Sequence, residues 1–94
     1  MAIVRSGQIT VAAAGTAIQG TAVAGRTFAF RAHPDNTDTA WIGSDEAASP
    51  DVSATTGFPL HTDGNTVVLT VNNLNQLWFD ADVNGEKVCW IRLD

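Results

Sequence analysis

The chain of 94 residues is long enough for one domain with a single small core and too short for two. Its net charge is −5, and its five Lys and Arg residues are scattered, which argues against nucleic acid or an anionic membrane as a partner, because both require clustered basic side chains. The one cysteine, Cys89, excludes an intramolecular disulfide and a multi-cysteine zinc site, so we expect a protein made in a reducing cytoplasm. Apolar runs stay below the roughly 18–20 residues of a membrane span, and the first residues lack a signal-peptide pattern.

The first half of the chain predicts β-strands rather than helices. Residues 11–25 are rich in alanine, but a glycine recurs every five residues there, and each would cost a helix about 1 kcal/mol. The β-branched residues between the glycines favour strands instead. Alternation places Ile9 and Val11 on one strand face, and Phe28 and Phe30 on one face of a later strand. The strands predicted here are the stretches GQITVAAAG, GTAIQGTAVAG, RTFAFRAH and TAWIG.

A polar segment and a proline-containing corner come next. Residues 44–56 are rich in Ser, Asp, Ala and Thr and are predicted to form a surface loop. Within the following stretch, TTGFPLHTDG, we expect Phe58 to insert into the core. Pro59 cannot donate to a strand ladder and therefore marks an edge or a corner, and Asp63-Gly64 then turns the chain. The predicted fold corner consists of Gly57, Phe58, Pro59 and Leu60.

Three more strands are predicted in the last third of the chain, from the stretches NTVVLTVNN, QLWFDADV and KVCWIRLD. The last two are joined by Asn84-Gly85, a pair that suits a type I′ hairpin turn between antiparallel strands. About seven or eight short strands with no substantial helix indicate an all-β fold, a single antiparallel β-sandwich of the jelly-roll or immunoglobulin-like type. A parallel sheet would need helical crossovers for which the chain has no room.

We expect residues 1–94 to form one sandwich domain. Its first seven residues are either an ordinary first strand or an N-terminal docking arm, because they contain apolar residues without a turn or partner of their own. The contacts of such an arm would come from Ile3, Val4 and Arg5.

The histidines are the first candidates for chemistry. His33 with Asp35 and His61 with Asp63 could together supply ligands for one zinc or iron ion. Their spacing is not specific, and both aspartates lie in turn sequences that explain them as turn formers. We therefore expect polar loop residues there and no metal site.

Nucleophiles and calcium ligands are equally weak candidates. Cys89 lies inside an apolar strand, where a cysteine usually acts as a small buried hydrophobic residue. No serine lies in a nucleophile elbow, and the acidic residues of the polar loop (Asp45, Glu46 and Asp51) lack the dense alternation of a calcium loop. We predict no catalytic residue, no cofactor and no metal, and hence a protein that is not an enzyme.

One strand face combines an aromatic side chain with two carboxylates. Trp78, Asp80 and Asp82 alternate along the strand QLWFDADV, and Trp41 lies beside the acidic loop. This pattern is either a solvated face with a tryptophan against a neighbour or subunit, or a stripe that binds a glycan. The four residues are our candidates for ligand or subunit contact.

Several short motifs follow one another in a definite order. An opening SGQITV and GTAIQ lead to WIG at residues 41–43, TTGFPL at 55–60, a glycine turn, VVLTVNNLNQLWFDA and a final NGEKVCWIRL. This order resembles that of small bacteriophage virion structural proteins of the capsid-decoration or head-associated β-sandwich type.

The resemblance covers roughly residues 25–93, together with the opening strands. It implies a non-enzymatic homo-oligomeric subunit that binds a major capsid protein or another virion protein, and a location in the virion after assembly in the host cytoplasm. Capsid decoration is the first expectation. A minor tail or fibre-base subunit, or a carbohydrate-binding module displayed on the virion, is the alternative.

Overall fold

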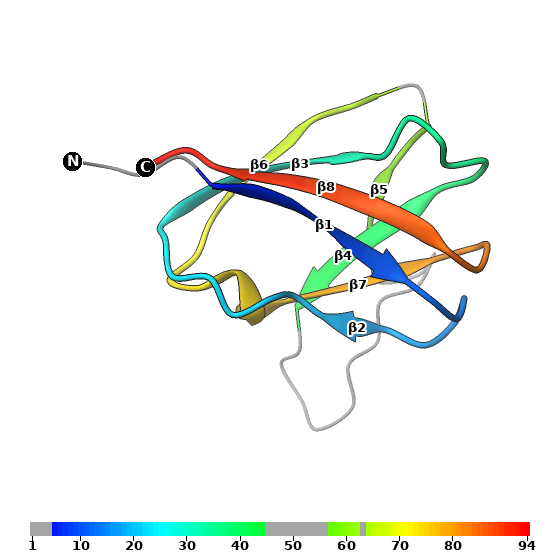
Figure 1. Ribbon diagram of the computed structural model, residues 1–94, viewed down its shortest axis with the longest axis horizontal. Coiled ribbons are helices and arrows are strands. Elements are labelled where there is room, and N and C mark those ends of the chain that lie inside the picture. The colour runs from blue at the N-terminus through cyan, green and yellow to red at the C-terminus, as the bar shows by residue number, and fades with distance from the viewer. Residues whose placement is uncertain (1–4, 45–56, 63) are drawn as a thin grey trace.

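The computed structural model describes residues 5–44, 57–62 and 64–94, and it confirms the all-β prediction (Figure 1). These residues form eight strands and one short 3₁₀ helix, and they contain no α-helix. The elements are β1 (Ser6–Val11), β2 (Ile18–Gln19), β3 (Thr27–Ala32), β4 (Ala40–Ser44), β5 (Phe58–Leu60), β6 (Val67–Thr70), η1 (Leu74–Gln76), β7 (Leu77–Ala81) and β8 (Glu86–Arg92).

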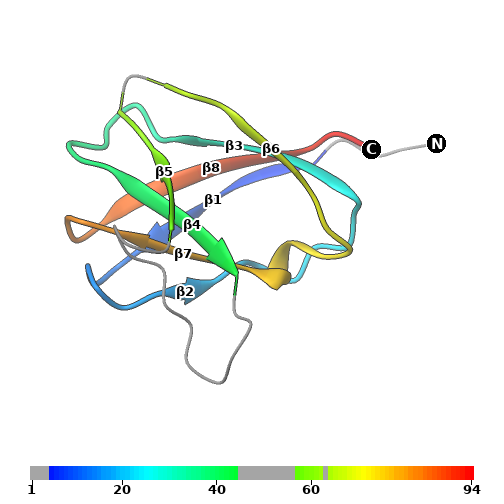
Figure 2. The same ribbon diagram turned by 180° about the vertical axis from the view of Figure 1, so that it is seen from behind.

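The strands make two antiparallel sheets that pack face to face (Figure 2). The first sheet has the order β1-β8-β3-β6 and the second sheet the order β2-β7-β4-β5. The chain changes sheet at every connection except the one from β4 to β5. An eight-stranded double sheet with this strand order is a jelly roll, which decides between the two sandwich types that the sequence left open.

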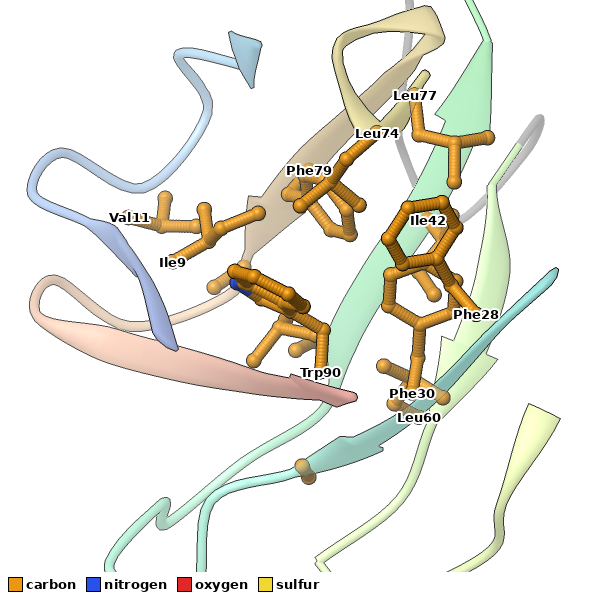
Figure 3. Close-up of a cluster of buried hydrophobic side chains, with 14 of the residues drawn as sticks. Ile9, Val11, Phe28, Phe30, Ile42, Leu60, Leu74, Leu77, Phe79 and Trp90 are labelled. Atoms are coloured by element: carbon orange, nitrogen blue, oxygen red, sulfur yellow. The ribbon is translucent and has the colours of Figure 1, made fainter. Parts of the chain in front are cut away.

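Aromatic side chains from both sheets fill the space between them (Figure 3). Phe28 lies 6.0 Å from Trp90 within the first sheet, measured between ring centroids, and Phe30 lies 5.8 Å from Phe79 of the second sheet. Phe30 and Phe79 therefore join the sheets through a direct ring contact. The buried core comprises Ile9, Val11, Val23, Phe28, Phe30, Ala32, Ala40, Ile42, Leu60, Leu74, Leu77, Phe79, Ala81, Val88 and Trp90.

The prediction that Phe58 anchors the core is wrong. Phe58 is 55% exposed, and it begins the three-residue strand β5, which lies at the edge of the second sheet. Pro59 pairs with Trp41 of β4, as expected for a proline confined to an edge, and Leu60 is the residue of this strand that is fully buried. The chain changes sheet after this strand, between Leu60 and Val67.

The strand predicted from GTAIQGTAVAG is only two residues long, because the chain leaves the second sheet after Gln19. The Gly20 amide donates to the carbonyl of Leu77 at 2.9 Å. Gly20 itself lies so close to the Leu74 carbonyl that any Cβ would collide with it. Farther on, the carbonyl of the buried Val23 accepts from the Leu74 amide at 2.9 Å. The glycine thus brings this segment against η1.

Two buried polar side chains attach the β3–β4 connection to β8. Asn36 donates to the Lys87 carbonyl at 2.7 Å and accepts from the Lys87 amide at 2.9 Å, so its amide group substitutes for a neighbouring strand. One oxygen of the Glu86 carboxylate accepts from the amides of Thr37 and Asp38 at 2.9 and 2.8 Å. Glu86 is only 5% exposed, so these bonds replace water that the carboxylate has lost.

Part of the predicted N-terminal docking arm belongs to strand β1. Ser6 and Gly7, which we included in the possible docking arm, pair with β8, and the Arg5 carbonyl accepts from the Arg92 amide at 2.8 Å. Ile3 and Val4 lie outside the described residues, as does the segment 45–56 with its three acidic side chains.

Candidate functional site

The two tryptophans of the predicted contact stripe lie on the outer side of the second sheet. Trp41 of β4 pairs with Asp80 of β7, and Trp78 pairs with Gly43, so side chains that alternate away from the buried Phe79 share this side. Both indoles are half-buried. The exposed carboxylate of Asp82 accepts from Trp41 Nε1 at 3.1 Å, which fixes the orientation of that ring.

Asp80 does not belong to a solvated face, contrary to our expectation. Its side chain is buried, and its Oδ1 accepts from the amides of Gly15 at 3.0 Å and Ala81 at 2.8 Å. Gly15 lies in the turn after β1 and has a φ of 85°, a conformation that glycine adopts without strain. Asp80 therefore attaches the β1–β2 connection to β7 and is not available to a ligand.

Replacing Asp80 with alanine is expected to destabilise the protein by about 2 kcal/mol, because two backbone N–H groups lose a charged acceptor. Asp80→Asn retains one carbonyl oxygen and should lose roughly half as much. Urea unfolding of the two variants measures the difference. Equal stability of Asp80→Ala and the wild type would show that water replaces the carboxylate without loss.

A pocket of about 550 Å³ lies beside Trp78, where the end of β6, η1, the start of β7 and β2 meet. Amide side chains and one indole dominate its wall. The described residues that line it are Gln19, Thr70, Val71, Asn72, Asn75, Gln76, Leu77 and Trp78.

Hydrogen bonds hold the pocket's amide groups in place. Asn73 and Gln76 form a capping box around η1, in which Gln76 Oε1 accepts from the amides of Asn72 and Asn73 at 2.6 and 3.2 Å. From β2, Gln19 donates its Nε2 to the carbonyl of Asn75 at 2.8 Å. The pocket's shape thus depends on polar side chains that are themselves part of the fold.

Of the pocket residues, only Trp78 was among our candidates. The amide-rich stretch NNLNQ was a visible signal, but its side chains come together with Gln19 only because η1 folds back toward β2. No periodicity in the sequence predicts that η1 and β2 lie next to each other.

The outer face of the first sheet carries long polar side chains (Gln8, Arg31 and Lys87) toward one end and three exposed apolar side chains farther along. A cross-strand row runs over all four strands through Ser6, Ile91, Ala29 and Val68. Ile91 is 38% exposed and Val68 56%, and Leu93, one row farther along, is 54% exposed. We call the surface made by the row and Leu93 the flat face.

Cys89 lies beside the flat face, paired with Gln8 on one side and Arg31 on the other. Partial burial raises the pKa of its thiol, and the nearby positive charges of Arg31 and Lys87 offset only part of this effect. The thiol is therefore protonated at neutral pH, which is unfavourable for a nucleophile.

Alkylation of Cys89 with iodoacetamide at neutral pH is expected to be slower in the folded protein than in the urea-unfolded chain, because the raised pKa leaves less thiolate. The rate should continue to rise with pH above the usual thiol pKa. Equal rates for folded and unfolded protein at neutral pH would contradict the raised pKa.

The histidines do not form a metal site with other residues that the structure describes. His33 Nδ1 accepts from the Asp35 amide at 3.0 Å, so this lone pair belongs to a turn. The same nitrogen lies 3.9 Å from the Asp35 carboxylate, a longer contact that is an ion pair only with a protonated ring. His61 is exposed on the β5–β6 connection, and Asp63 lies outside the described residues. Over residues 5–44, 57–62 and 64–94, no three His, Cys, Asp or Glu side chains gather as metal ligands.

Comparison with models of protein families, with curated proteins and with solved structures finds no match to this chain. Within the described part of the chain there is also no helix of the length and apolarity needed to cross a membrane.

Proposed function

We propose that this protein is a non-enzymatic structural subunit that associates with a second copy through the flat face and decorates a bacteriophage capsid. The flat face is the observation that supports association with a second copy. Ser6 and Ala29 are short, and exposed Ile91 and Val68 rise between and beside them across one row. Sheets pack on one another through such faces, and the burial of exposed aliphatic side chains favours association.

One pair of opposite charges lies at the two ends of the flat face. Arg31 lies one row from Ile91 on one side, and Leu93 and Asp94 lie on the other. The amides of Arg26 and Thr27 donate to the Asp94 carboxylate at 3.0 and 3.3 Å and lower its pKa, which keeps it ionised. A two-fold axis along the row would bring Arg31 of each copy toward the Asp94 carboxylate of the other, an end of the face that also carries Arg26 and Arg92.

The capsid part of the proposal rests on the sequence. Its support is the order of short motifs shared with small phage virion proteins, from WIG at residues 41–43 to the final NGEKVCWIRL. The jelly roll recurs in viral capsid and lectin domains, a fold-level analogy that is compatible with this role but does not establish it.

Sedimentation analysis of the purified protein tests the self-association. We expect a dimer or a larger assembly, and we expect the double variant Val68→Glu/Ile91→Glu to be monomeric because it places four carboxylates in the two-fold interface. Val83→Glu is the matched control, since Val83 is similarly exposed but lies in the β7–β8 turn. A wild-type monomer at all concentrations, or equal dissociation of both variants, would refute the flat face as the interface.

Cosedimentation with phage heads assembled without this protein tests the location. Saturable binding to heads is expected. Binding to tails and not to heads would replace decoration with a tail or fibre-base role, and binding to neither would remove the virion proposal.

A further inference from the structure

The pocket beside Trp78 has the dimensions of a small-molecule site. Its volume of about 550 Å³ lies within the roughly 300–1,000 Å³ of typical ligand pockets. None of the five residues of the flat face lines it, but Thr70 does, and Thr70 pairs with Thr27 next to Leu93 on the same side of the first sheet. A ligand bound in this pocket would be a second kind of partner, in addition to a second copy of the chain.

The lining selects a ligand without charge. None of its described residues is ionisable, and the polar ones are amides and a hydroxyl: Gln19, Thr70, Asn72, Asn75 and Gln76. Among these described residues, an anionic ligand would find no cation to replace its hydration, and a cationic ligand no carboxylate. Amides offer both donors and acceptors, which suits a ligand whose groups can do either.

In two of these amide side chains, one polar group is used by the fold and the other remains for a ligand. Gln76 Oε1 is occupied by the amides of Asn72 and Asn73, so its NH₂ group is the part that can donate. Gln19 Nε2 donates to the Asn75 carbonyl, so its Oε1 is the part that can accept. Since both side chains are already held in place, ordering them on binding costs little entropy.

Trp78 adds a flat apolar surface to these polar groups. Trp78 is half-buried near the start of β7 and lines the pocket. A pyranose ring has an apolar face of C–H groups and a rim of hydroxyls, so it can stack on an indole while its hydroxyls bond to surrounding amides. A nucleotide could also stack, but its phosphates would need basic side chains that the lining does not provide.

We propose that this pocket binds one or two residues of a neutral saccharide, stacked on Trp78 and hydrogen-bonded by Gln19 and Gln76. This site replaces the acidic stripe as the place of glycan contact: Asp80 is buried in backbone contacts, and Asp82 accepts from Trp41. Only Trp78 is common to both.

Titration of the ¹⁵N-labelled protein with neutral tetrasaccharides of glucose, galactose, mannose and N-acetylglucosamine tests the proposal. We expect at least one of them to shift the Trp78 indole signal with a Kd of about 1 mM or tighter. Trp78→Ala should weaken that binding at least about tenfold, the loss expected for an aromatic anchor. Trp41→Ala is the matched control, because it removes a half-buried indole from the neighbouring strand without touching the pocket, and it should change the Kd less than about twofold.

A second variant covers the case in which Trp78→Ala unfolds the protein. Asn72 is exposed and lines the pocket, so Asn72→Ala should leave the far-UV spectrum unchanged and weaken binding by about threefold or more. The proposal is overturned if no tetrasaccharide shifts the Trp78 signal at about 10 mM. It is equally overturned if Trp41→Ala weakens binding as much as Trp78→Ala, or if linear peptides bind the pocket and saccharides do not.

Discussion

Replacing Phe79 with alanine is expected to lower the free energy of unfolding by about 4 kcal/mol, within the range measured for large-to-small changes in protein cores. Phe79 is fully buried on the second sheet, and its ring contacts Phe30 of the first sheet at 5.8 Å between centroids. The truncation removes buried apolar surface from the core. It also leaves a cavity between the two sheets, because the strands are held by their pairing and cannot move in to fill it. Urea unfolding followed by tryptophan fluorescence gives the midpoint and the slope, and the midpoint should fall while the slope stays constant.

Phe58→Ala is the control for this prediction. It removes the same atoms from a side chain that is 55% exposed, so we expect a loss of less than about 1 kcal/mol. Similar losses for the two variants would mean that Phe58 contributes to the core after all and that the contact between Phe30 and Phe79 is not decisive.

Replacing Glu86 with alanine is expected to cost about 3 kcal/mol, although glutamates at the start of a strand are usually expendable. The buried carboxylate oxygen accepts from the backbone of Thr37 and Asp38, and the Thr37 hydroxyl lies 3.3 Å from it. Alanine leaves these donors without an acceptor and frees the β3–β4 connection from β8. Hydrogen exchange should show the amides of Thr37 and Asp38 losing protection first.

Glu86→Gln separates hydrogen bonding from charge and packing. It keeps the side chain's length and one acceptor oxygen, so we expect a loss of about 1 kcal/mol and retained protection of both amides. If Glu86→Gln is as unstable as Glu86→Ala, the accepted bonds alone do not explain the effect, and the negative charge itself stabilises this connection.

The strands were predictable because the signals that indicate them, alternating apolar residues and turn residues, lie within short stretches of the sequence. Alternation placed Phe28 and Phe30 inward, and Asn84-Gly85 marked the turn between β7 and β8. The antiparallel hairpin predicted at that turn is wrong, because β7 and β8 belong to different sheets and do not pair with each other. Phe58 misled because large aromatic residues are usually buried, whereas on the short edge strand β5 this side chain is 55% exposed. Strand order also escaped prediction, since it depends on pairs of strands far apart along the chain.

The candidate site was predictable only in part. The alternation in QLWFDADV correctly set Trp78 apart from Phe79. It could not reveal that the turn at Gly15 covers Asp80 and uses its carboxylate as an acceptor. Nor could it show that η1 brings Gln76 to Trp78, because that proximity is tertiary.

The central position of β8 in the first sheet has a consequence for how the protein is made. This strand pairs with β1 on one side and β3 on the other, and Ser6 meets Ile91 near the two ends of the chain (Figure 1). While residues 86–92 remain in the ribosomal exit tunnel, β1 and β3 have no strand between them, so the nascent chain cannot close its core. The sandwich should therefore fold only after residues 86–92 have left the tunnel, and folding should proceed over milliseconds to seconds, as in other proteins dominated by contacts between distant residues.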